Sequence, residues 1–395
     1  MEYNTITLSN GLRVIHLQSP SPVVYCGYEV CAGTRDEQTG EEGLAHFCEH
    51  VTFKGTSRRS SIQVLNCLES VGGELNAYTN KEETVFYAAI LKEHFPKAVD
   101  LLSDIVFNST YPQNEINKEV EVICDEIESY NDSPAELIYD DFENAIFEGH
   151  PLGHNILGCE KLLRGFTTDD ALRFTRRFYK PENAVFFVSG DVDFNKVVKL
   201  LKKATATFPA AKPLVDVAPK VSLPKYESRL FVNDKGTHQA HVMIGNRAYS
   251  VHDKRRMPLY LLNNILGGPG MNARLNLSLR ERHALVYTVE STMVCYSDTG
   301  LWCVYFGCDP KDINKCIKLV RRELDKIRQI KGQIGVACDN RESFALDFGK
   351  TFLHYGWKKD ITKLMDDIER ITAEDIQLVA QDIMTSGHLT SLVYE

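Results

Sequence analysis

Hydrophobic and polar residues alternate with a period of two near the start of the chain, over residues 5–17. The alternation surrounds Asn10-Gly11, a dipeptide typical of tight β-hairpin turns. Strand-like alternation returns over residues 229–247, and short β-rich runs occupy residues 184–189 and 389–394. The pattern therefore predicts strands in both halves of the chain.

A helical period of apolar residues takes over in residues 114–130. Ile116, Val120, Ile123 and Ile127 recur every three or four residues, which predicts an amphipathic helix with one buried stripe. Two further helices are expected to begin at threonine N-caps, one within residues 166–170 and one 205 residues later, within 371–375. Each of these is followed by one of the short β-rich runs.

This repeated order of helix and strand indicates a duplication. Prolines interrupt residues 208–226, which show little periodicity and therefore predict a linker. We expect a first domain at residues 1–208, a linker at 209–225 and a second domain at 226–395. Strands interleaved with long helices, beginning from a hairpin, favour an α+β fold of two similar domains, each a mixed β-sheet with helices packed on one face.

Candidate chemistry is concentrated in residues 43–50, which read GLAHFCEH. On a helix, His46 and His50 project from the same face and could share one tetrahedral metal ion. Glu49 reaches that face too, and its carboxylate could take a proton from a metal-bound water. This His-x-x-Glu-His order is the inverzincin motif and predicts a zinc hydrolase. The alternative is that these three residues are grouped by chance on a polar helix face. A third ligand elsewhere in the chain would favour the zinc site over this alternative.

The predicted helix at residues 114–130 offers that third ligand. Glu119 and Glu126 are seven residues apart and lie on one side, flanking the apolar stripe, whereas Glu121 and Glu128 point elsewhere. One of the first pair would bind the metal and the other would support it. Helix geometry alone leaves the choice between Glu119 and Glu126 open.

The motif His46-x-x-Glu49-His50, followed by Glu126 76 residues after the second histidine and by Glu119 a heptad before that, resembles the pitrilysin/insulysin superfamily of zinc peptidases. The resemblance implies that Glu126 is the third ligand of one zinc ion per chain and that Glu119 is the supporting glutamate. The length of 395 residues is similar to that of the short, two-domain processing-peptidase branch.

Other stretches extend the resemblance. Residues 72–79 and 84–87 look like the superfamily's substrate-binding edge strand and its neighbour, which implies that Asn76 and Ala77 bind substrate. Residues 267–281 and Tyr287 look like the signature of the second domain. The resemblance implies that Arg280 and Tyr287 bind the substrate backbone and the oxyanion, as hydrogen-bond donors. The alternative is that Arg280 is a surface charge and Tyr287 an aromatic residue of a strand.

The resemblance also implies a clamshell of two chains that encloses peptides, either a homodimer or a heterodimer with a related chain. Residues 260–265 of the second half, where the first half has its metal motif, contain no His or Glu, so this half is expected to be a non-catalytic copy.

The charge and hydrophobicity of the chain limit which kinds of partner it is expected to bind. A net charge of −9 argues against nucleic acid, and no apolar stretch approaches the ~18 residues of a membrane span. Residues 1–210 hold 19 Lys and Arg against 32 Asp and Glu, which would favour cationic peptides. The eleven cysteines are scattered along the chain, and the first residues do not look like a secretory signal. Both observations favour a cytoplasmic protein, and the alternative is a leader that has been removed.

These observations together predict a zinc-dependent endopeptidase that hydrolyses short unfolded peptides. A processing peptidase with a dedicated precursor is the first alternative, and a catalytically idle structural subunit is the second. The presence of His46, Glu49, His50 and Glu126 weighs against the idle subunit.

Overall fold

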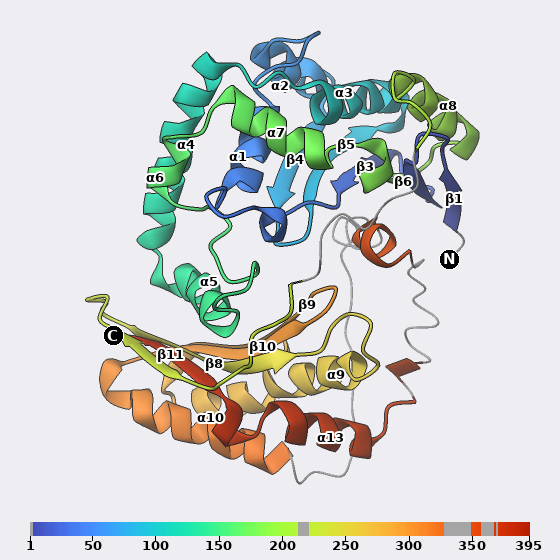
Figure 1. Cartoon of the computed structure of the whole chain (residues 1–395). Helices are drawn as coiled ribbons and strands as arrows, with labels where there is room; N and C mark the ends of the chain where they lie inside the picture. The colour runs from blue at the N-terminus through green and yellow to red at the C-terminus, as the bar shows by residue number, and fades with distance from the viewer. Residues whose placement is uncertain (1–2, 212–220, 328–348, 357–366, 369) are drawn as a thin grey trace. The chain divides into compact units, whose positions relative to one another are not determined.

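The hairpin predicted around Asn10-Gly11 begins a six-stranded sheet in the computed structural model, which describes residues 3–211, 221–327, 349–356, 367–368 and 370–395 (Figure 1). Its strands are β1 (Tyr3–Thr7), β2 (Arg13–Gln18), β3 (Val23–Val30), β4 (Glu74–Thr79), β5 (Thr84–Leu91) and β6 (Ala184–Gly190). They lie in the order β1-β2-β6-β3-β5-β4. Only β2 and β6 pair in parallel, so the sheet is mixed and β4 forms one of its edges.

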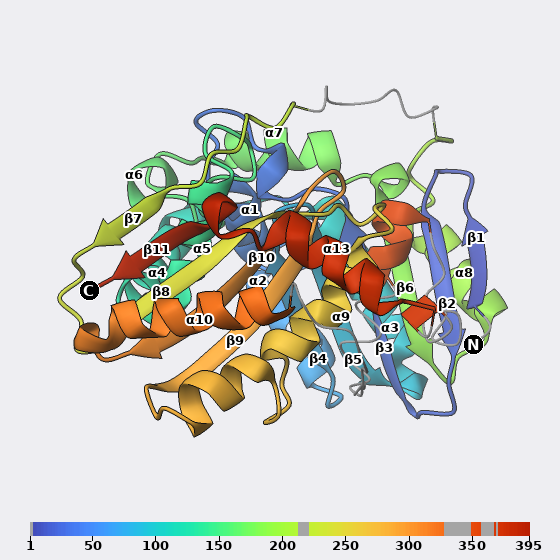
Figure 2. The same cartoon turned by 90° about the horizontal axis from the view of Figure 1, so that it is seen from below.

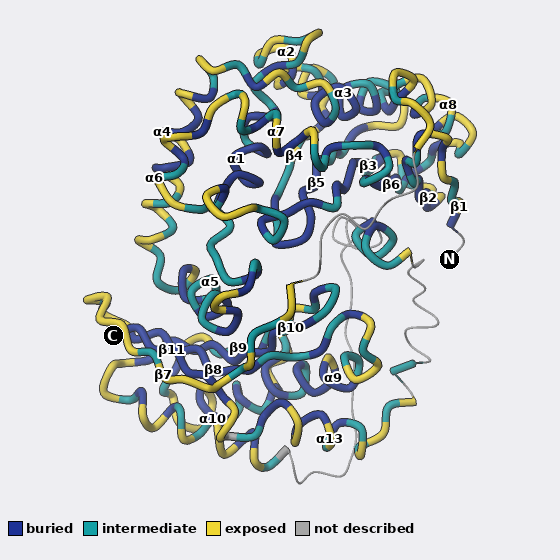
Figure 3. Tube along the Cα trace, viewed as in Figure 1, coloured by how far each residue is buried: buried dark blue, intermediate teal, exposed yellow. Residues whose placement is uncertain are grey.

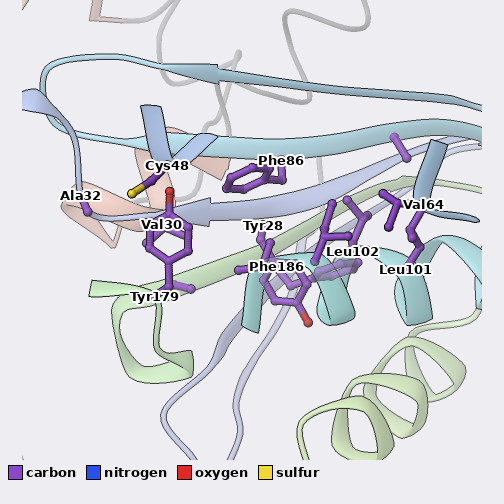
Figure 4. Close-up of a cluster of buried hydrophobic side chains, with 14 of the residues drawn as sticks. Tyr28, Val30, Ala32, Cys48, Val64, Phe86, Leu101, Leu102, Tyr179 and Phe186 are labelled. Atoms are coloured by element: carbon purple, nitrogen blue, oxygen red, sulfur yellow. The ribbon is translucent and has the colours of Figure 1, made fainter. Parts of the chain in front are cut away.

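Helices cover one face of this sheet: α1 (Leu44–Thr52), α2 (Ser61–Glu69), α3 (Phe95–Asn108), α7 (Thr168–Phe178) and α8 (Phe194–Ala204). The core between them contains Tyr28, Phe86 and Phe186, one from each of three neighbouring strands (Figure 4). The ring of Tyr28 meets that of Phe186 edge-on, with 4.9 Å between centroids, and its hydroxyl lies 2.8 Å from Ser103 Oγ on α3. This packing fixes the helix layer on the strands.

The amphipathic helix expected at residues 114–130 is α4 (Gln113–Asn131), and Ile116, Val120 and Ile123 are buried as predicted. The predicted threonine caps are also present. Thr167 caps α7, and Thr372 caps α13 (Ala373–Ile383) in the second half. Shorter helical segments are α6 (Glu160–Leu163), η1 (Thr34–Asp36), η2 (Lys92–His94), η3 (Pro181–Asn183), η4 (Asn276–Glu281), η5 (Pro310–Asp312) and η6 (Ser386–His388).

The second half contains a five-stranded mixed sheet (Figure 2). Its strands, β7 (Leu230–Asn233), β8 (Ala240–Ala248), β9 (Val286–Cys295), β10 (Gly300–Cys308) and β11 (Thr390–Tyr394), lie in the order β7-β11-β8-β10-β9. One face carries α9 (Arg256–Gly267) and α13, with α10 (Ile313–Ile327) packed against α13. Figure 3 shows that the central strands of each sheet are buried, whereas exposed positions concentrate on helices and connecting loops.

The two sheets repeat one topology, which confirms the predicted α+β duplication. In the first, β2 pairs in parallel with β6, and β3, β5 and β4 follow antiparallel. In the second, β7 pairs in parallel with β11, and β8, β10 and β9 follow antiparallel. Edge strand β9 is therefore the counterpart of edge strand β4.

The two compact units of the fold are not continuous in sequence. The first comprises Met1–Ile127, His154–Val221 and Cys338–Asp360, and the second comprises Glu128–Gly153, Ser222–Ala337 and Ile361–Glu395. Cutting the chain once, at the predicted linker (residues 209–225), would not reproduce either unit. Each unit also contains one segment from the other half of the chain. The domain boundaries expected from the sequence stay a prediction, and residues 212–220 of the linker lie outside the described residues.

Each exchanged segment covers the sheet face that the other helices leave open. In the first unit, Phe352 and Leu353 from the helical residues 349–355 pack against Ile15, Val185 and Phe187. In the second, α5 (Pro134–Ile146) places Ile138, Phe142 and Ile146 against Leu301, Cys303 and Tyr305 of β10. Alternate residues of β10, Trp302, Val304 and Phe306, face the opposite helix layer. Each sheet thus carries helical segments on both of its faces.

None of the helices in the described residues combines the length and the apolar character needed to cross a membrane.

Candidate metal centre and active site

Helix α1 carries the whole His-x-x-Glu-His motif. It begins after Gly43 and runs for nine residues, and all of them except His50 are buried. The imidazole rings of His46 and His50 lie with 4.6 Å between their centroids, so the i and i+4 spacing does bring them together on one face.

The carboxylate of Glu126, on α4, meets both histidines. Its Oε1 lies 3.9 Å from His46 Nε2, and its Oε2 lies 3.4 Å from His50 Nε2. One ligand atom from each of these three residues falls within 4.8 Å of the other two. The described residues contain no other group of this kind.

These separations fit a tetrahedral metal ion. Zinc bonds of about 2.0–2.2 Å in tetrahedral geometry place neighbouring ligand atoms roughly 3.3–3.6 Å apart. The distances of 3.9 and 3.4 Å from the Glu126 oxygens to the two histidine nitrogens are therefore close to those between ligand atoms around a bound zinc ion. Two imidazole nitrogens and one carboxylate are also a donor set of catalytic zinc, which leaves the fourth position for water.

Helix geometry alone did not distinguish Glu119 from Glu126, and in the structure Glu119 lies behind His50. Its Oε1 lies 3.1 Å from His50 Nδ1, on the side of the ring opposite Nε2. Its Oε2 pairs with Lys54 Nζ at 2.5 Å. A carboxylate on Nδ1 fixes the ring orientation and directs Nε2 toward Glu126. The geometry thus gives Glu126 and Glu119 different surroundings: Glu126 faces both histidines, and Glu119 backs one of them.

The ionisation of the two histidines differs. Burial, together with the neighbouring His50, lowers the pKa of His46 to about 4, so its ring is neutral and can donate a lone pair to a metal. Burial also lowers the pKa of His50, but hydrogen bonds to Glu119 and Glu126 outweigh it and raise the pKa to about 9. Hydrogen bonding to His50 lowers the pKa of Glu126. Binding of a metal would displace the proton from His50.

Glu49 is buried beside this group and is held by the edge strand. Thr79, the last residue of β4, donates its hydroxyl to Glu49 Oε2 at 2.6 Å. Burial raises the pKa of Glu49, and the Thr79 bond offsets part of that rise. A carboxylate with a raised pKa is suited to accept and return a proton near neutral pH.

The expected substrate strand is at the edge of the first sheet. Asn76 and Ala77 pair with Tyr87 and Phe86 of β5, and no strand among the described residues pairs with the other side of β4. Cys48, inside the motif, is buried and points its Sγ toward Ala171 O at 3.9 Å, away from the histidine face.

Arg280 and Tyr287 belong to the second unit and lie together there. The Arg280 guanidinium carbon is 5.5 Å from the centroid of the Tyr287 ring, and the Tyr287 residue is 80% exposed. Arg280 lies in η4, a π-helical turn, and Tyr287 lies at the start of edge strand β9. Their assignment to substrate and oxyanion binding stays a prediction.

Sequence reasoning missed two residues that support the site, Thr79 and Lys54. Lys54 follows His50 by four residues, so helical spacing was a usable signal for it. Thr79 depends on a contact between β4 and α1, which no local pattern predicts.

Comparisons with known proteins agree with this geometry. The model of the insulinase (peptidase family M16) domain matches residues 13–160, and that of the peptidase M16 inactive domain matches residues 165–332. An uncharacterised zinc protease of Streptomyces coelicolor is 31% identical over 398 residues, which cover 96% of this chain and 86% of that protein. The uncharacterised zinc protease YmxG of Bacillus subtilis is 29% identical, with 98% and 97% covered.

Two solved structures share the fold. A protease from Helicobacter pylori matches with a TM-score of 0.91 and 21% identity, covering 100% of this chain and 99% of that one. A peptidase M16 inactive domain from Pseudomonas fluorescens matches with a TM-score of 0.88 and 16% identity, covering 100% and 98%.

Proposed function

The chain belongs to the insulinase family of M16 peptidases, and from that membership we propose that it is a zinc-dependent endopeptidase acting on short unfolded peptides. One observation carries the proposal. His46, His50 and Glu126 bring their ligand atoms within 4.8 Å of one another, with Glu49 on the same helix as the two histidines.

His46, His50 and Glu126 would hold one zinc ion, with Glu119 orienting His50. Zinc bound by these three residues would supply Lewis-acid chemistry, which lowers the pKa of a coordinated water toward neutrality. Glu49 would accept a proton from the attacking water at the carboxylate oxygen that Thr79 does not contact, as the water oxygen bonds to the peptide carbonyl carbon. It would return that proton to the nitrogen of the leaving amine as the C–N bond breaks. Thr79 holds the carboxylate in place during both transfers.

The peptide would lie extended beside β4 and add a strand to the sheet edge. Main-chain groups of Asn76 and Ala77 would bind the peptide backbone, and such contacts tolerate many side chains. The guanidinium of Arg280 and the phenol of Tyr287 would donate to the backbone and the developing oxyanion, supplied by a partner copy or by a related chain. Under this proposal the active form is a homodimer or a heterodimer.

The test combines metal content with cleavage of a quenched-fluorescent peptide library by the wild type, Glu49→Gln and Glu69→Gln. Glu69 is an exposed carboxylate at the end of α2, so it is the matched control. We expect one zinc per chain in all three proteins and turnover in the wild type and the control. We expect Glu49→Gln to be slower by roughly 10²- to 10⁴-fold.

Zinc without turnover in the wild type, even after mixing with candidate partner chains, or full activity of Glu49→Gln, would overturn the mechanism. Absence of bound zinc would overturn the metal assignment itself.

A further inference from the structure

The first turn of α1 is capped from outside the helix, by Glu37. Its N-cap residue is Gly43, which has no side chain to accept a hydrogen bond. Glu37 Oε2 instead accepts from Gly43 N at 3.0 Å, and Oε1 accepts from Ala45 N at 2.7 Å. These donors are among the N–H groups that a helix start leaves without partners. The Glu37 side chain is 1% exposed, so these bonds form in a site shielded from water.

His154 completes the arrangement from a different part of the chain. Its Nε2 donates to Glu37 Oε2 at 2.8 Å, and its own carbonyl oxygen accepts from Lys81 Nζ. The loop after His154 also touches the helix start. A Cβ on Gly43 would lie 2.7 Å from Gly158 Cα, and a Cβ on Gly158 would lie 2.4 Å from Glu42 O. Both glycines have positive φ, 93° and 72°, so larger residues are disfavoured on two grounds.

The segment that carries Glu37 is tied to the turn after the substrate edge strand. Thr34 N donates to Asn80 O at 3.2 Å, and Arg35 N donates to Lys81 O at 2.8 Å. Arg35 also pairs with Glu82 at 2.6 Å. Residues 34–37 therefore connect the end of β4 to the start of α1.

From these contacts we infer that Glu37, supported by His154, is a positioning residue that sets the placement of α1 relative to edge strand β4. The inference rests on the proposed function. Helix α1 has only nine residues, and a helix this short is held by its surroundings more than by its own hydrogen bonds. His46 directly follows Ala45, so a displacement of the first turn moves the metal ligands and Glu49 together. A displacement of about 1 Å can cost 10²-fold in rate.

The experiment compares Glu37→Gln with Asp193→Asn. Asp193 Oδ1 accepts from Lys196 N at 2.9 Å and caps α8, in the same unit but not on α1. Both variants exchange a capping carboxylate for an amide, so Asp193→Asn controls for the loss of a negative charge at a helix N-terminus. In Glu37→Gln the amide nitrogen faces one of three donors and cannot accept from it. His154→Ala removes one of the three bonds and serves as the milder variant.

Each protein is measured well below its melting temperature, by steady-state kinetics and by the visible absorption of Co²⁺ titrated into the metal-free chain. For Glu37→Gln we expect kcat to fall about 10- to 100-fold with KM nearly unchanged, and the Co²⁺ spectrum to shift. Asp193→Asn should retain the wild-type kcat and spectrum. His154→Ala should show a smaller change of the same kind, which keeps the inference testable if Glu37→Gln does not fold.

Wild-type kcat and an unshifted Co²⁺ spectrum in Glu37→Gln and His154→Ala would overturn the inference and leave the proposed function standing. A wild-type chain that binds no Co²⁺ and cleaves no peptide would overturn both.

Discussion

Glu119 is held by cations on both sides, with His50 Nδ1 at 3.1 Å and Lys54 Nζ at 2.5 Å. Burial raises the pKa of Glu119, but these two partners outweigh it and lower the pKa, so the residue is ionised at neutral pH. An ionised carboxylate against Nδ1 makes the opposite nitrogen of the ring a better metal ligand. Under the proposed function, Glu119 would thus influence a bound metal without being one of the three ligands that lie closest together.

Replacing Glu119 by Gln is therefore expected to weaken zinc binding by about 10- to 100-fold while the fold is kept. Competition with a chelating dye measures the affinity. Glu121→Gln is the matched control, because Glu121 lies on the same helix with a side chain 63% exposed and pairs with Arg164 at the surface. Equal zinc affinities in the two variants would contradict the supporting role.

At the scale of secondary-structure elements, α7 and α13 occupy equivalent places before β6 and β11 and begin with the same capping box. Thr167 Oγ accepts from Asp170 N at 3.4 Å, and Thr372 Oγ accepts from Asp375 N at 3.1 Å. In both, the aspartate returns the bond by accepting from the threonine N at 2.9 Å. Each box satisfies N–H groups that the helix start would otherwise leave free.

Thr167→Ala and Thr372→Ala are each expected to lower the free energy of unfolding by about 1 kcal/mol, because each loses one capping bond. Urea denaturation measures this, and Thr→Ser at the same positions should retain most of the stability. An alanine variant as stable as its serine counterpart would show that the cap contributes nothing there.

These caps, the hairpin at Asn10-Gly11 and the α4 stripe were predictable because each depends on residues close in sequence. The same holds for the pairing of His46 with His50, which needs only helical spacing. Thr79 and Glu37 were not predictable from the sequence. Thr79 binds Glu49, 30 residues away, and Glu37 binds partners 6, 8 and 117 residues away, so both depend on how strands and loops pack. Helix spacing alone could not choose between Glu126 and Glu119 as the third candidate ligand. That choice needed either the resemblance to a known superfamily or the packed position of α4.

At the scale of the whole molecule, Glu83 joins the helical residues 349–355 to the rest of the first unit. Its Oε1 pairs with Lys350 Nζ at 2.6 Å and its Oε2 with His354 Nε2 at 3.0 Å. Burial raises the pKa of Glu83, but the two cations outweigh it and lower the pKa to about 2. Burial lowers the pKa of His354, whereas Cys31 and Glu83 raise it to about 10.

The signs of these shifts define a pH window. The lowered pKa of Glu83 means that its carboxylate stabilises the fold above the usual value of 4.5, and that this is lost as the pH falls toward 2. The raised pKa of His354 means that its contribution is full below 6.5 and is lost as the pH rises toward 10. We expect Glu83→Gln to lower the melting temperature most between these values, 4.5 and 6.5. A melting-temperature difference that does not vary with pH, or one matched by the exposed control Glu93→Gln, would contradict this.

The exchange of segments makes each unit depend on both halves of the chain. A fragment of residues 1–208 lacks Leu353, which packs on Ile15 and Val185, and it lacks both cations that face Glu83. A fragment of residues 226–395 lacks α5, whose Ile138, Phe142 and Ile146 cover β10. Exposing a large apolar side chain costs about 1.5–3 kcal/mol, so the loss of α5 alone amounts to a large share of a domain's stability.

Neither fragment is therefore expected to unfold cooperatively by itself, whereas the two expressed together should co-purify and regain a cooperative melt. Thermal unfolding followed by circular dichroism, with size-exclusion chromatography, tests this. Phe142→Ala in the first fragment should weaken the assembly, because Phe142 is fully buried against the second sheet, while Ile62→Ala, at a position 68% exposed on α2, should not. A fragment of residues 1–208 that melts alone at the temperature of the intact chain would show that the exchanged helix contributes little, and that the duplicated halves are independent folding units.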